Sequence, residues 1–330
     1  MHEWYAAPME GLTGWRWRQV QHEMFGGAAL YVTPFVSPNG NFSFQRKELE
    51  ELDPERNRGI PVVPQILTNR AEYFVWAAKE CRSRGWEQVD LNLGCPSGTV
   101  TGKKKGAGLL RQPELLRQLL DGIFDALPDM KISVKTRIGW ERAEEWPALL
   151  ALLETYPICR LTVHPRVRTQ FYKGTADREV FRWTAEHTAL PLCYNGDVTT
   201  VRDLREMGET FPDDAVMVGR GLVADPSLLR QATGGPAASL EELREFHDRL
   251  YGLYCRDFSG DVPVLHHMGS CGTISPGPSG RRTPCCGRCI RPGTAGHMKR
   301  RCGSFSMTQS CPIDDICKGI MLYTKNPRFP

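Results

Sequence analysis

The chain has 330 residues, of which 41% are hydrophobic and 24% charged, an ordinary balance for a globular protein with one large domain and a smaller one. No run of about 18 apolar residues is present, which argues against a membrane span. The first residues lack the basic-then-apolar pattern of a signal peptide. We therefore expect a cytoplasmic protein whose thiols are reduced.

Charge and cysteine are unevenly distributed along the chain. Residues 269–330 contain 7 of the 12 cysteines, and 10 Lys or Arg against 2 Asp or Glu. The preceding 268 residues contain 32 basic and 36 acidic residues, so the overall charge of +4 comes from the C-terminal tail. The body of the protein therefore lacks the basic character of a domain that binds nucleic acid by charge alone, and we expect no DNA partner.

Short β-rich runs alternate with amphipathic segments as far as about residue 235. Eight of these runs predict strands, at 4–8, 30–33, 62–66, 88–93, 131–137, 160–164, 192–195 and 215–219. The segments between them that show helical periodicity include 72–84, 113–126, 143–156, 199–207 and 226–233.

Eight strand–helix units predict an α/β fold of the TIM (β/α)8 barrel type, and their span is close to the ~250 residues typical of that fold. The alternative is an open doubly wound sheet. No Gly-x-Gly-x-x-Gly motif opens the first crossover, which disfavours it. We predict a barrel over residues 1–236, with chemistry at the C-terminal ends of its strands.

A second, helical module follows the predicted barrel. Ser239 is a suitable N-cap, and Glu242 completes a capping box with it. The apolar residues that follow have the spacing of one amphipathic helix, which reaches about residue 255. We assign residues 237–268 to the start of a small helical domain and residues 269–330 to an atypical tail.

The last two predicted strands end in residues suited to a phosphate. Asn195, Gly196 and Asp197 follow one strand, and Gly219 and Arg220 follow the next. Glycines let backbone N–H groups approach a phosphate, and an arginine adds charge-assisted hydrogen bonds. Gly196 by itself is compatible with an ordinary turn. Both loops together predict a phosphate site, which this fold usually places there.

Three other strand ends carry polar side chains. Lys135 and Arg137 share one face of their strand, and a lysine inside a barrel is costly unless its charge is balanced. A structural ion pair is the alternative to a functional role. His164 ends the next strand beside Arg166, and Gln65 ends the third. These positions predict contacts with a ligand in the barrel mouth.

Cys95 is the candidate for chemistry. It lies in a Gly94-Cys95-Pro96 turn after the fourth strand, where Pro96 ends the strand and Gly94 would allow an unusual backbone angle. A thiol with a pKa near ~8.5 can donate a proton at neutral pH. The alternative is a small buried apolar residue, which is how we interpret Cys81, Cys159, Cys193 and Cys255.

The motifs together resemble those of the tRNA-dihydrouridine synthases over residues 1–268. The matching segments occur in the family's order: Ala7-Pro8-Met9-Glu10-Gly11, Asn92-Leu93-Gly94-Cys95-Pro96, Gly106-Ala107-Gly108-Leu109-Leu110, Val134-Lys135-Thr136-Arg137, His164-Pro165-Arg166, Tyr194-Asn195-Gly196-Asp197 and Gly219-Arg220-Gly221.

The resemblance implies an FMN enzyme that uses NADPH or NADH to reduce the C5–C6 bond of uridine in tRNA. Hydride would pass from the flavin to C6, and Cys95 would protonate C5. FMN would contact Pro8, Met9, Glu10, Gln65, Lys135 and His164, and its phosphate would lie near Asn195, Gly196, Asp197, Gly219 and Arg220.

The target uridine must leave its stack to reach a flavin, so basic residues should line the mouth. We assign RNA contacts to Asn92, Lys103, Lys104, Lys105, Arg137, Arg166 and Arg168. A solvated loop is the alternative for the three lysines. The partners expected are tRNA and NAD(P)H, with a monomeric protein and no membrane.

The tail departs from the family pattern, because residues 269–296 are rich in Gly, Pro, Cys and Arg and lack periodicity. Cys286 and Cys289 offer two zinc ligands, but a second Cys-x-x-Cys pair is missing. We favour a shifted reading frame that begins near Met268. Ordinary codons for 269–279, read in the neighbouring frame, can encode an aromatic-rich helix. Such a tail would be disordered and metal-free.

Two other functions remain open from the sequence. The first is a flavoprotein like dihydroorotate dehydrogenase, which shares the barrel and FMN but lacks the helical module and the Gly-Cys-Pro turn. The second is a tRNA-binding protein with impaired catalysis, because the tail would leave the tRNA-binding module incomplete.

Overall fold

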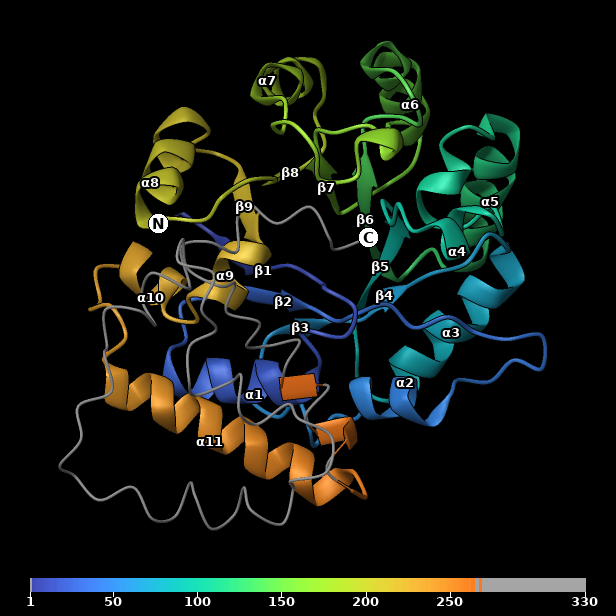
Figure 1. Ribbon diagram of the computed structural model, residues 1–330. Coiled ribbons are helices and arrows are strands. Elements are labelled where there is room, and N and C mark those ends of the chain that lie inside the picture. The colour runs from blue at the N-terminus through green and yellow to red at the C-terminus, as the bar shows by residue number, and fades with distance from the viewer. Residues whose placement is uncertain (1, 261, 265–266, 269–330) are drawn as a thin grey trace, which may run out of the picture.

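The computed structural model describes residues 2–260, 262–264 and 267–268. The helices surround a ring of strands (Figure 1). Within the described residues, nine strands share one sheet, namely β1 (Trp4–Ala6), β2 (Leu30–Val32), β3 (Val62–Val63), β4 (Gln65–Ile66), β5 (Gln88–Leu93), β6 (Lys131–Arg137), β7 (Arg160–His164), β8 (Leu192–Asn195) and β9 (Ala215–Val218).

Every strand pairing is parallel, and the strands follow the order β3-β2-β1-β9-β8-β7-β6-β5-β4. The first and last members of this order, β3 and β4, are separated in the chain by Pro64 alone. The sheet therefore closes on itself through one covalently continuous strand. This arrangement confirms the predicted TIM barrel.

The break at Pro64 follows from its missing N–H group. Thr33 donates its N–H to the Val63 carbonyl at 3.0 Å, and Val36 donates to Gln65 at 2.8 Å, so β2 and the segment after it pair on both sides of the proline. Asp90 donates its N–H to the Pro64 carbonyl at 2.8 Å. The third predicted strand is thus one barrel strand that is divided into β3 and β4.

Side chains alternate between the two faces of each strand, as strand geometry requires. In β5, Val89, Leu91 and Leu93 join the apolar layer under the helices. Asp90 and Asn92 take the other face and are 3% and 7% exposed. A buried strand with polar residues on its inner face indicates a barrel whose interior serves chemistry as well as packing.

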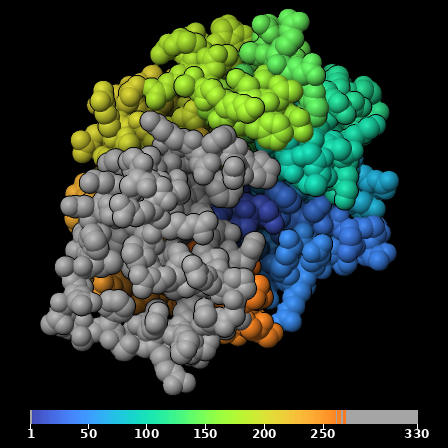
Figure 2. Space-filling view, in the orientation of Figure 1, coloured from blue at the N-terminus to red at the C-terminus, as the bar shows by residue number. Residues whose placement is uncertain are grey.

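Helices and short helical turns connect the strands and cover the barrel. They are α1 (Trp15–Met24), α2 (Arg46–Glu51), α3 (Ala71–Ser83), α4 (Gly98–Thr101), η1 (Gly106–Leu109), α5 (Pro113–Ala126), η2 (Ala143–Glu145), α6 (Trp146–Leu153), η3 (Arg168–Gln170), α7 (Arg178–His187), α8 (Val201–Thr210), α9 (Arg220–Ala224), α10 (Leu228–Ala232) and α11 (Leu240–Asp257). Figure 2 shows the same view as a surface, on which the green and yellow-green segments lie together above the blue ones. None of the helices in the described ranges is both long and apolar enough to span a membrane.

Helix α11 begins at the predicted capping box. Ser239 accepts the N–H of Glu242, and the Glu242 carboxylate accepts the N–H of Ser239 at 2.8 Å. Hydrogen bonds from Arg230, and secondly from Ser239, lower the pKa of Glu242 to about 2. The helix packs along α1, where Arg16 forms an ion pair with Asp257.

The barrel interior has two dissimilar halves. The strands β1, β2, β8 and β9 contribute a separate apolar cluster, which we call the apolar half: Tyr5, Ala7, Val32, Cys193, Ala215 and Met217. The strands β4 to β7 contribute polar inward residues, which we call the polar half: Gln65, Asp90, Asn92, Ser133, Lys135, Thr162 and His164.

Candidate active site

Parallel strands of a closed barrel end at the same rim, so the residues at their C-terminal ends gather there. The structure brings most of the predicted site residues to this end. They follow β1 (Pro8, Met9, Glu10), lie in β4 to β7 (Gln65, Asn92, Lys135, Arg137, His164) or follow β7 to β9 (Arg166, Asn195, Gly196, Asp197, Gly219, Arg220), and the Cys95 loop lies beside them.

Asn92 fixes the loop that carries Cys95. Its Oδ1 accepts the backbone N–H of Gly94 at 3.0 Å and of Cys95 at 2.9 Å, and its Nδ2 donates to Gln65 Oε1 at 2.7 Å. Asn92 is 7% exposed and was predicted to contact RNA. Its carbonyl oxygen is occupied by the loop, and the structure gives it a positioning role.

Gly94 does not have the backbone conformation that the sequence predicted. Its φ is not in the left-handed region, so the expected unusual backbone angle is wrong. A Cβ there would lie 3.4 Å from the Thr136 carbonyl carbon and 3.5 Å from the Lys135 oxygen, which are ordinary van der Waals distances. The structure therefore gives no steric reason for a glycine at this position.

Arg137 and Gly106 hold the same loop from two sides. Arg137 donates from Nε to the Gly94 carbonyl at 3.0 Å and from Nη1 to the Val167 carbonyl at 3.1 Å. Gly106 has φ +55°, and a Cβ there would lie 3.0 Å from the Cys95 oxygen. Arg137 is 1% exposed, so its burial leaves little surface for the predicted contact with RNA.

The Cys95 thiol is half-buried in this setting. Burial raises the pKa of the thiol above its ordinary value, and a backbone hydrogen bond from Ser97 and the charge of Arg137 offset only part of that effect. The sulfur therefore keeps its proton at neutral pH. A protonated thiol at the end of a barrel is suited to act as an acid, and unsuited to act as a thiolate nucleophile.

Lys135 lies on the inward face of β6. Burial is the main cause that lowers its pKa to about 8, followed by the charge of Arg137, while Asp90 acts in the opposite direction. No hydrogen bond from the Lys135 ammonium to another described residue is present. An ammonium group that is partly removed from water and makes no hydrogen bond to the described residues favours a ligand that is negatively charged or accepts hydrogen bonds.

Three side chains form a connected cluster at the ends of β7, β8 and β9. Asp197 accepts a bidentate pair from Arg166 at 3.0 and 2.6 Å, and Arg220 donates to its Oδ1 at 2.8 Å. The hydrogen bonds from Arg166 and Ala176 lower the pKa of Asp197 despite its partial burial. Asp197 therefore orients two arginines, rather than meeting a phosphate itself.

Arg166 is a correction to the predicted RNA contacts. It is 1% exposed, and its guanidinium also donates to the carbonyls of Lys173 and Gly174 and lies 3.1 Å from His164 Nε2. Every face of this guanidinium meets protein, so no face remains for RNA. Burial, and then the charges of Arg137 and Lys135, lower the pKa of His164 well below its usual range and keep the imidazole neutral.

The glycines of the predicted phosphate site are both at close approaches. A Cβ on Gly196 would lie 2.6 Å from the Ala176 Cβ, and one on Gly219 would lie 3.3 Å from the Met9 sulfur. Gly219 precedes the first turn of α9, which starts at Arg220. Gly196 therefore allows this loop to pack closely against Ala176, and a side chain at Gly219 would require a small shift of Met9.

The predicted residues after β1 and in the lysine run lie toward the outside of this end. Glu10 is exposed and forms an ion pair with Lys47 at 3.4 Å. Lys103 and Lys104 are exposed, whereas Lys105 donates to Ser37 Oγ at 3.0 Å. The first two lysines are therefore free to meet a large polyanion.

Aromatic side chains accompany the arginines of the rim. The Arg168 guanidinium lies 4.7 Å from the ring centroids of both Trp140 and Phe171. Tyr172, 39% exposed, lies beneath Arg137 at 5.7 Å and Arg220 at 5.0 Å. These cation–π contacts hold the guanidinium groups of Arg168 and Arg220 in place at the rim.

Sequence reasoning missed Asp90 and Ser133. Asp90 Oδ1 accepts from Ser133 Oγ at 2.7 Å, and its Oδ2 accepts from Gln65 Nε2 at 2.8 Å. Burial raises the pKa of Asp90 to about 6, although both hydrogen bonds oppose the shift. Two-residue alternation along the strands would have placed Asp90 on the face of Asn92, and Ser133 on that of Lys135.

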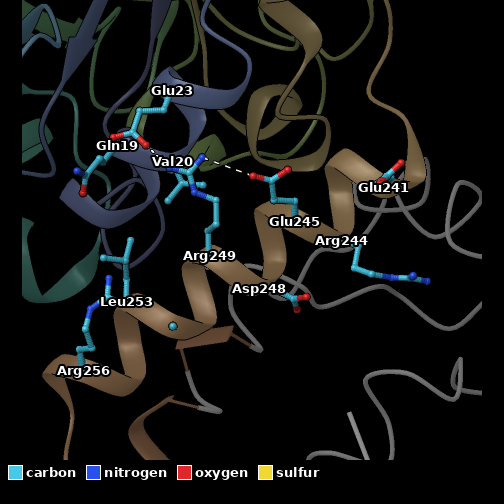
Figure 3. A pocket seen from close by; sticks show the side chains of 11 residues that line it. Gln19, Val20, Glu23, Glu241, Arg244, Glu245, Asp248, Arg249, Leu253 and Arg256 are labelled. Carbon is cyan, nitrogen blue, oxygen red and sulfur yellow. Dashed lines mark hydrogen bonds and ion pairs between the residues drawn. The ribbon is translucent and has the colours of Figure 1, made fainter. Parts of the chain in front are cut away.

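A separate groove of about 690 Å³ lies between α1 and α11 (Figure 3). Arg249 projects into it from α11 and forms ion pairs with Glu23 and Glu245. Its lining residues come from these two helices and include no strand end. The groove is thus distinct from the candidate active site.

Solved structures with a similar fold support the barrel assignment. Histamine dehydrogenase from Rhizobium sp. 4-9 superposes with a TM-score of 0.53 at 12% identity, over 74% of this chain and 46% of that one. A variant of NCR from Zymomonas mobilis gives 0.52 at 14% identity, over 71% and 87%. At these identities the likeness concerns the fold alone.

Sequence relatives are closer. A probable tRNA-dihydrouridine synthase of Rhizobium leguminosarum bv. phaseoli is 30% identical over 262 residues, or 79% of this chain and 81% of the relative. A tRNA-dihydrouridine synthase B of Pseudomonas putida is 31% identical over 269 residues, or 78% and 77%. The family model described as dihydrouridine synthase (Dus) matches residues 5–250. The chain therefore belongs to the dihydrouridine synthase family.

Proposed function

We propose that this protein is a flavin-dependent tRNA-dihydrouridine synthase that reduces the C5–C6 bond of uridine in tRNA through FMN, with NADPH or NADH as the reductant. One observation carries the proposal beyond the family. A protonated Cys95 thiol and a Lys135 ammonium without a hydrogen bond to the described residues, both half-buried, lie at the same end of the barrel. This pairing offers an acid beside a cation that suits an electron-rich ring.

The residues at this end fit FMN. Gly219 and Arg220 offer a side-chain-free backbone and a guanidinium for the phosphate, and Gly196 offers the second open backbone. Lys135 would face the ring, and neutral His164 would lie beside it. Gln65 is fully buried, with its amide bonded to Asp90 and Asn92, so we expect it to support the site from behind.

When bound, FMN supplies the hydride for C6 of the uracil ring, after reduction by NADPH or NADH. The protein supplies the proton for C5, which Cys95 holds because burial raises its pKa. Addition of hydride to C6 leaves an enolate on the uracil, and the thiol quenches it. Lys135 would stabilise negative charge on the reduced flavin ring.

The tRNA would approach across the rim above this site. The exposed Lys103 and Lys104, together with Arg168 between its two aromatic rings, remain our candidates for contacts with RNA. Asn92, Arg137 and Arg166 act instead within the protein, where they hold loops. We expect the protein to act as a cytoplasmic monomer.

The test is anaerobic reoxidation of the bound flavin. Purified full-length protein should be yellow, NADPH should bleach it, and tRNA that lacks dihydrouridine should restore the flavin absorbance with formation of dihydrouridine. Cys95→Ala should bind flavin equally and lose about 10²- to 10⁴-fold in the rate of tRNA reduction, as expected for removal of a general acid. Cys159→Ala is the matched control and should behave as wild type.

The outcomes separate the three functions. Reoxidation by orotate but not by tRNA would favour an enzyme like dihydroorotate dehydrogenase. Binding of tRNA without reoxidation would favour a tRNA-binding protein that has lost catalysis.

The predictions about the tail, namely disorder, a shifted frame and the zinc alternative, lie outside the described residues. The coding DNA around Met268 tests the shifted frame, which predicts slow tRNA reduction with normal flavin binding.

A further inference from the structure

The polar half of the barrel contains a buried carboxylate with no role in the chemistry above. Asp90 is 3% exposed and lies on β5, two residues before Asn92 and five before Cys95. Taking an ionised carboxylate out of water is unfavourable unless hydrogen bonds compensate. Burial accordingly raises its pKa. Its hydrogen bonds form one continuous path to the Cys95 loop.

The path has fixed ends. At one end, the backbone N–H groups of Gly94 and Cys95 can only donate, so Asn92 must present Oδ1 to them, at 3.0 and 2.9 Å. Asn92 Nδ2 then faces Gln65 Oε1 at 2.7 Å. Gln65 Nε2 is left to donate at 2.8 Å to Asp90, which as a carboxylate can only accept.

Each link therefore requires the next. The two amides have two orientations each, and the orientation that serves the loop requires an acceptor atom at position 90 facing Gln65 Nε2. Ser133 Oγ occupies the other Asp90 oxygen at 2.7 Å, so the carboxylate is held by two donors. Gln65 is fully buried, and water cannot substitute for a lost partner without a rearrangement.

We infer that Asp90 is a positioning residue, which fixes the orientation of the Gln65 and Asn92 side-chain amides and thereby holds the backbone of the acid Cys95 in place. Asp90 touches neither substrate nor thiol. Its effect on turnover rests on the proposed function, but its effect on the Cys95 loop does not.

The substitution Asp90→Asn removes the pure acceptor at nearly constant volume. The new amide can keep Oδ1 toward Gln65 Nε2 if it turns Nδ2 toward Ser133 Oγ, because a hydroxyl accepts as well as donates. The path to the loop is then intact, so Asp90→Asn alone should change the Cys95 loop little.

A carboxylate at position 92 requires a donor at position 90. In Asp90→Asn with Asn92→Asp, Gln65 Nε2 donates to the new carboxylate at position 92, and the other oxygen of that carboxylate accepts the loop N–H groups. The acceptor has moved along the path, and every donor is again satisfied. Asn92→Asp alone places a carboxylate against Gln65 Oε1 and should release the loop.

The experiment is iodoacetamide labelling of the flavin-bearing full-length protein at pH 8, without tRNA. Trypsin releases Cys95 within residues 85–103, and Cys255 within residues 250–256, each peptide with a single cysteine. The exposed Cys255 is the internal standard. Asp121→Asn is the matched control, because Asp121 also accepts a hydrogen bond at 2.7 Å, from Tyr156, but on α5.

N92D should label Cys95 about tenfold faster than wild type, and both D90N and the double variant within about twofold of wild type, a coupling expected for residues in one hydrogen-bond network. An N92D rate equal to wild type, or a double variant as fast as N92D, would overturn the inference. If D90N does not fold, the comparison of N92D with the double variant decides alone. A negative result in the labelling experiment would not affect the proposed function, because the proposed function is tested by reoxidation of the flavin by tRNA.

Discussion

The two halves of the barrel interior differ in the kind of side chain that they remove from water. The apolar half, on β1, β2, β8 and β9, buries six side chains without a formal charge. The polar half, on β4 to β7, buries Asp90 and His164 and half-buries Lys135, at the end of the barrel that carries the Cys95 loop. One half excludes water to stabilise the fold, and the other excludes water to strengthen the electrostatics of a site.

The energetic contrast is large. Each fully buried apolar side chain contributes about 1.5–3 kcal/mol. The shifts of the pKa of Asp90 to about 6 and of Lys135 to about 8 indicate that each charge is destabilised by on the order of 3 kcal/mol. The apolar half therefore stabilises the barrel, whereas the polar half carries the residues of the candidate active site.

A cavity in the apolar half tests that division most strongly. Met217, 2% exposed, belongs to the apolar cluster, so Met217→Ala should lower the free energy of unfolding by about 2–4 kcal/mol. Denaturant titration measures this loss. The labelling rate of Cys95 in the folded protein should stay unchanged. A faster Cys95 reaction would show that the halves are mechanically coupled and break the comparison.

The pH dependence of stability sharpens the description of the polar half. His164 has a folded-state pKa well below its usual range, so below about pH 6.5 the unfolded chain binds a proton that the folded chain rejects. The free energy of unfolding should therefore fall with decreasing pH, by at most about 1.4 kcal/mol per pH unit. Asp90 acts oppositely between about pH 4 and 6, because its folded-state pKa is raised.

Denaturant titrations of wild type and His164→Gln at pH 7 and pH 5 measure the histidine contribution. The advantage of wild type over the variant should shrink at pH 5. Parallel profiles for the two proteins would mean that the folded chain tolerates a charged imidazole, contrary to its buried position among Arg137, Lys135 and Arg166.

The smallest effect is expected outside the barrel, at the rim above the polar half. Lys103 is exposed near the Cys95 loop, whereas Lys131 is exposed at the opposite end of β6. Lys103→Gln should weaken tRNA binding a few-fold and reduce the slope of log affinity against log salt by roughly 0.7–0.9. Lys131→Gln should change neither quantity. Equal effects of both variants would contradict a rim-specific contact.

The strands were predictable because burial on both faces produces compact runs with clear boundaries. Five predicted ranges, 88–93, 131–137, 160–164, 192–195 and 113–126, coincide with β5, β6, β7, β8 and α5. The division of the third strand was not foreseen, because it depends on how Pro64 meets both neighbours. The helix expected over 143–156 begins as a 3-10 turn and ends at Leu153.

The site was predictable in its location more than in its contacts. Strand ends placed Lys135, His164 and Cys95 at one rim, since that follows from topology. The role of Arg166 depends on Asp197, a residue 31 positions away, and a sequence does not reveal such pairing. Asp90 was overlooked because a carboxylate inside a strand carries no motif of its own.

The two halves also differ in how they emerge during synthesis. The strands of the polar half, β4 to β7, form one unbroken stretch between residues 65 and 164, whereas the apolar half joins the first two strands to the last two, with Trp4 beside Val216. The polar half is therefore fully synthesised long before the apolar half, which needs β8 and β9 to close the barrel. Until β9 has left the exit tunnel, Tyr5 and Val32 lack their partners, and a nascent chain arrested there would present an open apolar edge to chaperones.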